Sequence, residues 1–248
     1  MNNFLLCNVD TDAISVCKND MSPFTEEEIT ALTESLNSLF PEYIRWEDDG
    51  YYSFFGVLKA KNYIMEIDGK IKLKGSSIRD QKKEPILKHM LDEMIYDLVR
   101  NDGVNIRKLY VSYIKEALAP KDIKQWSQKK TLTKAILDCS KNPEARKNER
   151  VVFDAIKDKP LQEGDKIYVY PCIFSSVKEE TVLKNGKVRV KEHKEVGLKC
   201  SEDYSNDADT LKLVDRVYAT IQILSNVIDM TQIIDYTLSK NKHLLEAL

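Results

Sequence analysis

Two carboxylates separated by one residue, Asp10 and Asp12, lie close to the start of the chain. They belong to the polar segment VDTD, which separates the apolar runs FLLC and AISV. This pattern predicts a strand, a tight turn and a second strand over residues 3–16. A rigid turn can direct carboxylate oxygens toward a divalent cation, and metal ions held in this way catalyse phosphoryl transfer. Most D-x-D segments are ordinary turn acids, so the motif alone leaves both interpretations open.

The elements that must position this turn follow directly in the sequence. Thr25 and Glu28 form a capping box, and apolar residues then recur at helical spacing until a proline, which predicts a helix. Two turn signals come next, Asp49-Gly50 and Asp68-Gly69. They separate the segments YYSFFGVLKA, KNYIMEI and KIKLKG, and this predicts a group of strands. A hairpin, a helix and these strands make up a first region, residues 1–80.

The second region, residues 81–248, is predicted to be mainly helical. Pro85 suits a first helical turn, and apolar residues recur at helical spacing after it and again before Pro120. A small β insertion is expected over residues 166–177, with a hairpin turn at Asn185-Gly186. Further helices are expected over residues 144–156, 209–228 and 233–245. The predicted fold class is therefore α+β.

Charge is strongly segregated along this chain of 248 residues, although its formal net charge is only −2. Residues 20–50 carry nine acids and one base, whereas residues 57–83 carry eight bases and three acids. A second basic stretch covers residues 121–150. Basic stripes on a nearly neutral chain are typical of a protein that binds a polyanion on one face. Solvated surface lysines are the alternative that charge alone leaves open.

Composition excludes several classes of protein. The five cysteines form no C-x-x-C pair and leave an odd number, which argues for a reducing compartment and against a disulfide scaffold or zinc site. The stretch 217–228 is apolar but too short to cross a bilayer, and acids interrupt the amino terminus where a signal peptide would be apolar. We therefore expect no membrane association and a cytoplasmic location.

The order of the motifs resembles that of family B DNA polymerases. In that family a palm hairpin carries a DTDS motif (motif C), and a KKRY-like motif and a K-G-x-x-x-R element lead into the thumb. Here DTDA replaces DTDS, Val9 stands where the family usually has glycine, and A-K-N-Y replaces K-K-R-Y. Lys74-Gly75 begins the third element, which ends at Arg79. The segments KKTLTK and EGDKIY extend the likeness into a phage-type thumb, so that it covers nearly the whole chain.

The resemblance implies a partial palm over residues 1–80 and a thumb over residues 81–248. It makes Asp12 the principal ligand of a catalytic Mg²⁺, with Asp10 assisting. It also implies a surface that grips primer-template DNA, formed by Lys59, Lys61, Tyr63, Lys74, Arg79, Lys134, Arg146 and Lys147. From the residues alone, Tyr63 is as readily a half-buried strand aromatic, and Arg79 is as readily an ion-pair partner of Asp80 or Glu84.

The same comparison shows which polymerase parts have no candidate here. Only nine residues precede Asp10, and neither the motif A aspartate, the fingers lysine nor the exonuclease can be assigned. We therefore expect the C-terminal piece of a split polymerase, phage-encoded and acting in the bacterial cytoplasm. Its partners would be primer-template DNA and a polypeptide with the exonuclease, fingers and remaining palm. The resemblance leaves open whether a sliding clamp is a further partner.

Two predictions separate this hypothesis from its alternatives. A chain that lacks its palm partner should expose a large apolar surface on its first strand and helix. One alternative is a non-catalytic, thumb-like DNA-binding module without such a partner. Another is a structural protein with an incidental Asp-Thr-Asp, which requires basic residues scattered over the fold rather than gathered on one face.

Overall fold

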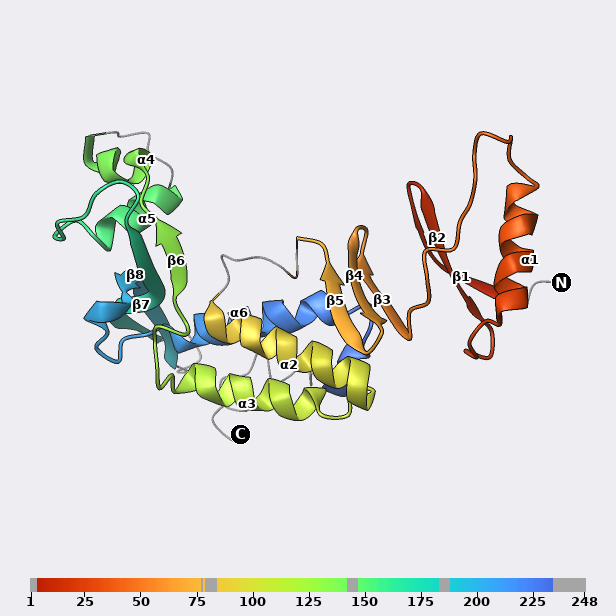
Figure 1. Cartoon of the computed structure of the whole chain (residues 1–248). Coiled ribbons are helices and arrows are strands. Elements are labelled where there is room, and N and C mark those ends of the chain that lie inside the picture. Colours follow the sequence, from red (N-terminus) through yellow and green to blue (C-terminus); the bar gives the residue numbers. More distant parts are fainter. Residues whose placement is uncertain (1–3, 77, 79–83, 142–146, 183–187, 234–248) are drawn as a thin grey trace. The chain divides into compact units, whose positions relative to one another are not determined.

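The computed structural model describes residues 4–76, 78, 84–141, 147–182 and 188–233. The chain divides into two compact units, Met1–Ile78 and Arg79–Leu248, here called the first and second units (Figure 1). Both combine helices with small antiparallel sheets, which confirms the α+β class. The division falls two residues before the boundary expected from the sequence, and the assignment of the units as palm and thumb stays a prediction.

The first unit begins with the predicted hairpin. Strand β1 (Phe4–Asp10) pairs antiparallel with β2 (Ala13–Lys18), and the last pair, Asp10 with Ala13, leaves Thr11 and Asp12 as the turn. The pairing shifts by one residue between Leu6 and Asn8, which marks a bulge. No third strand pairs with this hairpin among the described residues.

Helix α1 (Glu26–Asn37) follows as predicted, with Thr25 as its N-cap. The Glu28 N–H donates to Thr25 Oγ1 at 3.3 Å, and the Thr25 N–H donates to Glu28 Oε2 at 2.8 Å, so the capping box is complete. Lys18 of β2 forms an ion pair with Glu28 at 2.5 Å. No residue of α1 is buried.

A three-stranded meander completes the first unit: β3 (Phe54–Lys59), β4 (Asn62–Ile67) and β5 (Lys70–Lys74). The Asp68-Gly69 turn is confirmed, since both residues adopt the positive φ that a tight hairpin turn requires. The strand predicted in the segment YYSFFGVLKA is confirmed as β3, although β3 begins at Phe54 rather than at Tyr51. Residues 41–53 contain no strand, and the Ser53 N–H donates to the Glu66 carbonyl at 3.0 Å just before β3 begins.

Three helices form the core of the second unit: α2 (Pro85–Asn101), α3 (Ile106–Leu118) and α6 (Thr210–Ile221). Pro85 occupies the first turn of α2, as predicted. Glu84, which precedes it, is buried and pairs with Arg216 of α6. The helices pack through fully buried side chains, including Leu87, Met90, Leu91, Met94, Leu213 and Ile221. Short helical segments flank this core at Gln222–Leu224 and at α7 (Met230–Ile233).

The second unit also contains a three-stranded sheet in the order β6 (Gln128–Thr131), β7 (Lys166–Val182) and β8 (Val188–Cys200). The insertion is longer than predicted, and β6 had no sequence signal. Asn185-Gly186 lies outside the described residues.

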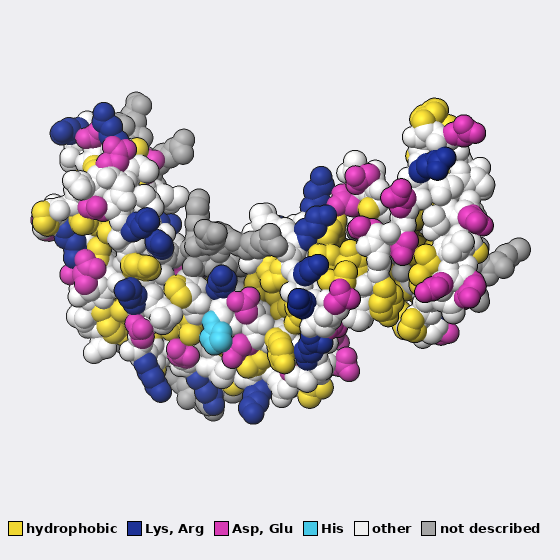
Figure 2. Space-filling view, viewed as in Figure 1, with side chains coloured by type: hydrophobic (Ala, Val, Ile, Leu, Met, Phe, Trp, Pro, Cys, Tyr) yellow, Lys and Arg dark blue, Asp and Glu magenta, His cyan; other side chains and the backbone are white. Residues whose placement is uncertain are grey.

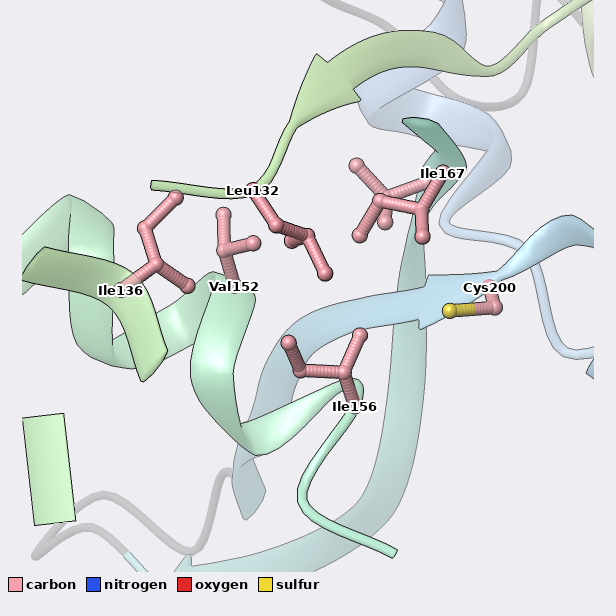
Figure 3. Close-up of a cluster of buried hydrophobic side chains, with 7 residues drawn as sticks. Leu132, Ile136, Val152, Ile156, Ile167 and Cys200 are labelled. Carbon is pink, nitrogen blue, oxygen red and sulfur yellow. The ribbon is translucent and has the colours of Figure 1, made fainter. Parts of the chain in front are cut away.

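Short helices pack on this sheet, namely α4 (Lys134–Leu137), α5 (Lys147–Asp154) and the 3-10 turns Asp138–Lys141 and Ser201–Asp203. Apolar side chains from them and from the strands form a buried cluster: Leu132, Ile136, Val152, Ile156, Ile167, Val169 and Cys200 (Figure 3).

The cysteines divide between the units. Cys139, Cys172 and Cys200 are buried and free in the second unit, as expected of core residues. Cys7 is exposed and Cys17 is partly exposed, so the two hairpin thiols are accessible, unlike those of the second unit. None of the described helices has the length and apolar character that crossing a membrane requires.

Candidate functional site

The acidic turn presents its two carboxylates differently. Asp10, the last residue of β1, is half-buried, and Thr11 Oγ1 donates to its Oδ1 at 3.4 Å. Asp12 is exposed at the tip of the turn. Within the described part of the chain, Asp12 has neither a hydrogen-bond nor an ion-pair partner. The carboxylate of Asp12 is therefore the one that is open to a ligand from outside.

A tyrosine connects this turn to the strand meander. The Tyr63 hydroxyl donates to Asp10 Oδ2 at 3.2 Å and accepts the Lys61 N–H at 3.1 Å. The Tyr63 side chain is only 4% exposed, and its ring stacks on Phe55 at 5.5 Å between centroids. In this structure Tyr63 offers no free ring face to a ligand. It holds Asp10 beside the turn between β3 and β4.

The turn between β3 and β4 has a constrained backbone conformation. Lys61 adopts a φ of 60°, and the Asn62 side-chain amide donates to the Ala60 carbonyl at 2.8 Å. Gly75, just past β5, lies directly against it with a φ of 111°. A Cβ on Gly75 would stand 2.3 Å from Asn62 Oδ1 and 2.6 Å from the Lys61 carbonyl oxygen. Only glycine allows this close approach.

Three predicted DNA-binding lysines lie at one end of the meander. Lys59 ends β3 opposite Asn62, Lys61 lies in the turn, and Lys74 ends β5 opposite Tyr63. All three are exposed, and Lys74 Nζ lies 5.7 Å from the centre of the Tyr63 ring. Figure 2 shows dark blue side chains along the β5 side of this sheet. The acidic turn and a lysine cluster therefore meet through Tyr63.

The donor chemistry of the turn fits Mg²⁺ in part. Carboxylate oxygens are the ligands that Mg²⁺ prefers, and Asp12, with Asp10 beside it, supplies two carboxylates. No group of three or more His, Cys, Asp or Glu side chains that could hold a metal occurs among the residues described. Any ion bound here would take its remaining ligands from water, substrate or another chain.

The other predicted DNA-binding residues are not part of this cluster. Lys134 is exposed at the start of α4 in the second unit, where its N–H donates to Glu163 Oε1 at 3.3 Å. Arg79 and Arg146 lie outside the described residues, as does the side chain of Lys147. Their roles stay predictions.

The Cys7 thiol of the hairpin is poorly reactive at neutral pH. Partial burial raises the pKa of the Cys7 thiol to about 11, and its interaction with Cys17 across the hairpin adds to the effect. A thiol with so high a pKa is almost wholly protonated at neutral pH. Cys7 is therefore not a candidate nucleophile or metal ligand.

The first strand exposes large apolar side chains, as the split-polymerase hypothesis predicted, but helix α1, for which the same was predicted, exposes none. None of residues 4–53 is buried. On β1, Leu6 and Val9 are each 63% exposed. Because directly paired residues project to the same side of a hairpin, Leu6, Val9, Ile14 and Val16 share one face, whereas Asp10 projects from the other. The hairpin thus has one face that bears the site and an apolar face on which Leu6 and Val9 are largely exposed.

Two residues that complete the site, Asn62 and Gly75, were not singled out from the sequence. Asn62 holds the turn through its side-chain amide, and Gly75 lets β5 approach that turn. The signal for Gly75 was present, because a glycine directly after an alternating strand indicates a close backbone approach. Nothing in the sequence indicated that Tyr63 would bond to Asp10, which is 53 positions away.

Comparison with known proteins adds no family assignment: no protein-family model matches this chain, and no curated protein sequence matches it either.

Proposed function

We propose that this chain is the C-terminal part of a family B DNA polymerase, which contributes metal-binding acids and a DNA-gripping surface to a site completed by another polypeptide. The observation that carries the proposal is the Tyr63 hydroxyl, which bonds to Asp10 while accepting the Lys61 N–H. An acidic turn and a lysine-rich strand end are the two parts that template-directed nucleotidyl transfer needs in one place. The acidic turn would bind metal ions, and the lysines would bind backbone phosphates.

The two acids have different roles in this proposal. Asp12 is exposed and has no partner within the described residues, so it is the principal ligand for Mg²⁺. Asp10 is already bonded to Tyr63 and Thr11, so it assists and fixes the turn. When bound, Mg²⁺ would activate the attacking oxygen and stabilise the leaving group.

The lysines supply the grip on the duplex. Lys59, Lys61 and Lys74 are exposed at one end of the meander and would neutralise phosphates without reading bases. Lys134, with Arg79, Arg146 and Lys147, is proposed to extend this contact from the thumb. The clustering of the first three argues against a structural protein with scattered bases.

A second polypeptide must complete the site. Two carboxylates cannot satisfy two octahedral magnesium ions, and Leu6 and Val9 on the apolar face of the hairpin are each 63% exposed. The partner is proposed to carry the exonuclease, the fingers and the remaining palm, and the assembled enzyme to act in the cytoplasm, with a sliding clamp as a possible further partner.

The first experiment measures binding of a fluorescent primer-template duplex to the full chain by anisotropy over a range of salt concentrations. Replacing both Lys61 and Lys74 by Ala should weaken binding and reduce the salt slope by about 2, because each lost phosphate contact lowers it by about 0.9. Lys70→Ala is the matched control, since Lys70 lies at the far end of β5. Equal effects of both changes would contradict a localised grip.

The second experiment addresses catalysis. The D12N chain, combined with the partner polypeptide, should lose nucleotide incorporation yet bind duplex as tightly as the unchanged protein. If D12N abolishes duplex binding instead, the carboxylate is structural. If the unchanged chain binds duplex but no partner restores incorporation, the non-catalytic thumb-like module is the better description.

A further inference from the structure

A second exposed surface lies in the segment that follows α1. Four large hydrophobic side chains occur within six residues there: Leu39, Phe40, Tyr43 and Ile44 are 74%, 40%, 85% and 43% exposed. Figure 2 shows hydrophobic side chains at the tip of the loop that follows α1, with acidic side chains close by. Exposed clusters of this kind are typical of interaction sites. We call residues 38–46 the pinned loop.

The loop is held in a defined shape by Asn37, the last residue of α1. The Asn37 side-chain amide donates to the Trp46 carbonyl at 3.0 Å, and the Trp46 N–H donates to Asn37 Oδ1 at 2.7 Å. One side chain thus satisfies both backbone groups of Trp46. The Phe40 and Trp46 rings contact each other at 5.7 Å, and the Ile44 N–H donates to the Pro41 carbonyl at 2.8 Å. The apolar side chains are therefore presented by an ordered loop, which lowers the entropy cost of binding.

The charge around the loop indicates which kind of partner fits. Arg45 is the only base among residues 20–50, and four acids surround it: Glu42, Glu47, Asp48 and Asp49. Acidic surfaces repel phosphates, so neither a nucleic acid nor an anionic membrane suits this surface. Basic groups beside an apolar groove would complement it.

The lysine-rich surface of β3–β5 does not offer such a groove. Its lysines are exposed, but no large hydrophobic side chain is exposed among the described residues of 54–78. If a second copy bound through this surface, its lysines would pair with the acids of the pinned loop, but the apolar side chains of the loop would have no apolar surface to contact. We therefore assign the loop to a different protein.

We propose that the pinned loop docks into an apolar groove, edged by lysine and arginine, on a separate protein chain. Tyr43 and Leu39 enter the groove, and the flanking acids pair with the basic rim. The proposal depends on neither metal binding nor DNA binding by this chain.

The test uses two synthetic amphipathic helical peptides of equal length, one of leucine and lysine and one of leucine and glutamate, each titrated into the full chain by calorimetry. The leucine–lysine peptide should bind and the leucine–glutamate peptide should not. Replacing both Leu39 and Tyr43 by Ser should weaken binding about tenfold or more, because a few exposed anchors dominate such contacts. Asn37→Ala should weaken peptide binding about fivefold, because the loop loses the two hydrogen bonds to Trp46 that hold its shape. The far-UV circular dichroism spectrum of this variant should be unchanged.

The matched control replaces Tyr96 and Val104 by Ser, since these side chains are 58% and 79% exposed in the second unit. This variant should bind the peptide like the unchanged chain. The proposal fails if the control loses as much affinity as the loop variant, if both peptides or neither bind, or if N37A binds normally. It also fails if sedimentation velocity detects a dimer that the Leu39/Tyr43 variant abolishes, because a second copy is then the occupant.

Discussion

Residues 4–53 and the helices of the second unit both contain many apolar side chains but use them differently. In α2, α3 and α6 the apolar faces are buried against one another. Among residues 4–53 no side chain is buried, although the strands pair and α1 is correctly capped. Local rules are therefore sufficient to specify these elements, whereas a core requires a second layer.

The difference concerns stability as well as shape. A two-stranded hairpin is at best marginally stable in water, and a 12-residue helix without a buried face gains little from packing. The second unit has its own core, so its stability should not depend on a partner. The predictions below test this contrast, beginning with the largest expected effect.

Leu213→Ala should destabilise the second unit by about 3 kcal/mol, because this α6 side chain is fully buried and its loss leaves a cavity. Leu32→Ala, at a partly exposed position of α1, should cost less than about 1 kcal/mol. Denaturant unfolding followed by tryptophan fluorescence separates the units, because Trp46 lies in the first and Trp126 in the second. Equal losses of unfolding free energy in the two variants would contradict the contrast between the units.

The Asp207 network should make the second unit sensitive to acid. Burial favours the neutral carboxyl, but hydrogen bonds from Lys199 Nζ at 2.5 Å and Tyr170 Oη at 2.6 Å outweigh it and lower the pKa of Asp207 to about 2. The stabilisation is complete above the unfolded-state pKa of about 4 and is lost as pH falls toward 2. Asp207→Asn should cost about 2 kcal/mol at pH 7 and flatten the pH dependence of unfolding between 4 and 2. An unchanged slope in that window would contradict the assignment.

Tyr63→Phe should loosen the connection between the hairpin and the meander without disturbing either sheet. The ring remains, but the bonds to Asp10 and to the Lys61 N–H are lost, at a cost of about 1 kcal/mol. Amide hydrogen exchange should accelerate near Asp10 and Lys61 while the core of α2 is unaffected. Tyr52→Phe, which keeps a ring contact with Phe55, is the control and should leave both rates unchanged.

The two units should differ in the rate at which an alkylating reagent modifies their cysteine thiols. In the folded chain Cys7 and Cys17 should react with an alkylating reagent, whereas Cys139, Cys172 and Cys200 should be protected by burial. Because its pKa is about 11, Cys7 should react slowly at pH 8 and continue to accelerate above pH 10. A rate that levels off near pH 9 would indicate an ordinary thiol.

Elements with strong local signals were predictable from the sequence. The Asp10–Asp12 turn, the α1 capping box and the Pro85 helix start each depend on two or three neighbouring residues, and all three are confirmed. Strand β6 was missed because the segment QKKT has no apolar alternation and forms a strand only through its pairing with β7. The strand predicted over residues 51–60 begins only at Phe54, because the two tyrosines at the start of that segment have no backbone pairing with β4.

The candidate site was predictable only in its parts. The residue types of Asp10, Lys61 and Tyr63 suggested chemistry, but the hydrogen bond that joins them crosses more than 50 positions and depends on how the hairpin meets the meander. A side chain's burial is also a tertiary property, so the sequence could not decide between a covered and an exposed Tyr63. The first unit's uncovered apolar surface was predicted from the missing polymerase parts rather than from any local pattern.

The steric demand at Gly75 bears on how the ancestry of this protein can be traced. Lysines and aspartates can be exchanged or moved within a few positions while a charged surface persists, so charge patterns fade as lineages diverge. A backbone that leaves no space for a single methyl group changes far more slowly. Searches for remote homologues should therefore give more weight to Gly75 and Asn62 than to the basic residues around them. The pattern to search for is a glycine directly after the third meander strand, with an asparagine thirteen positions before it.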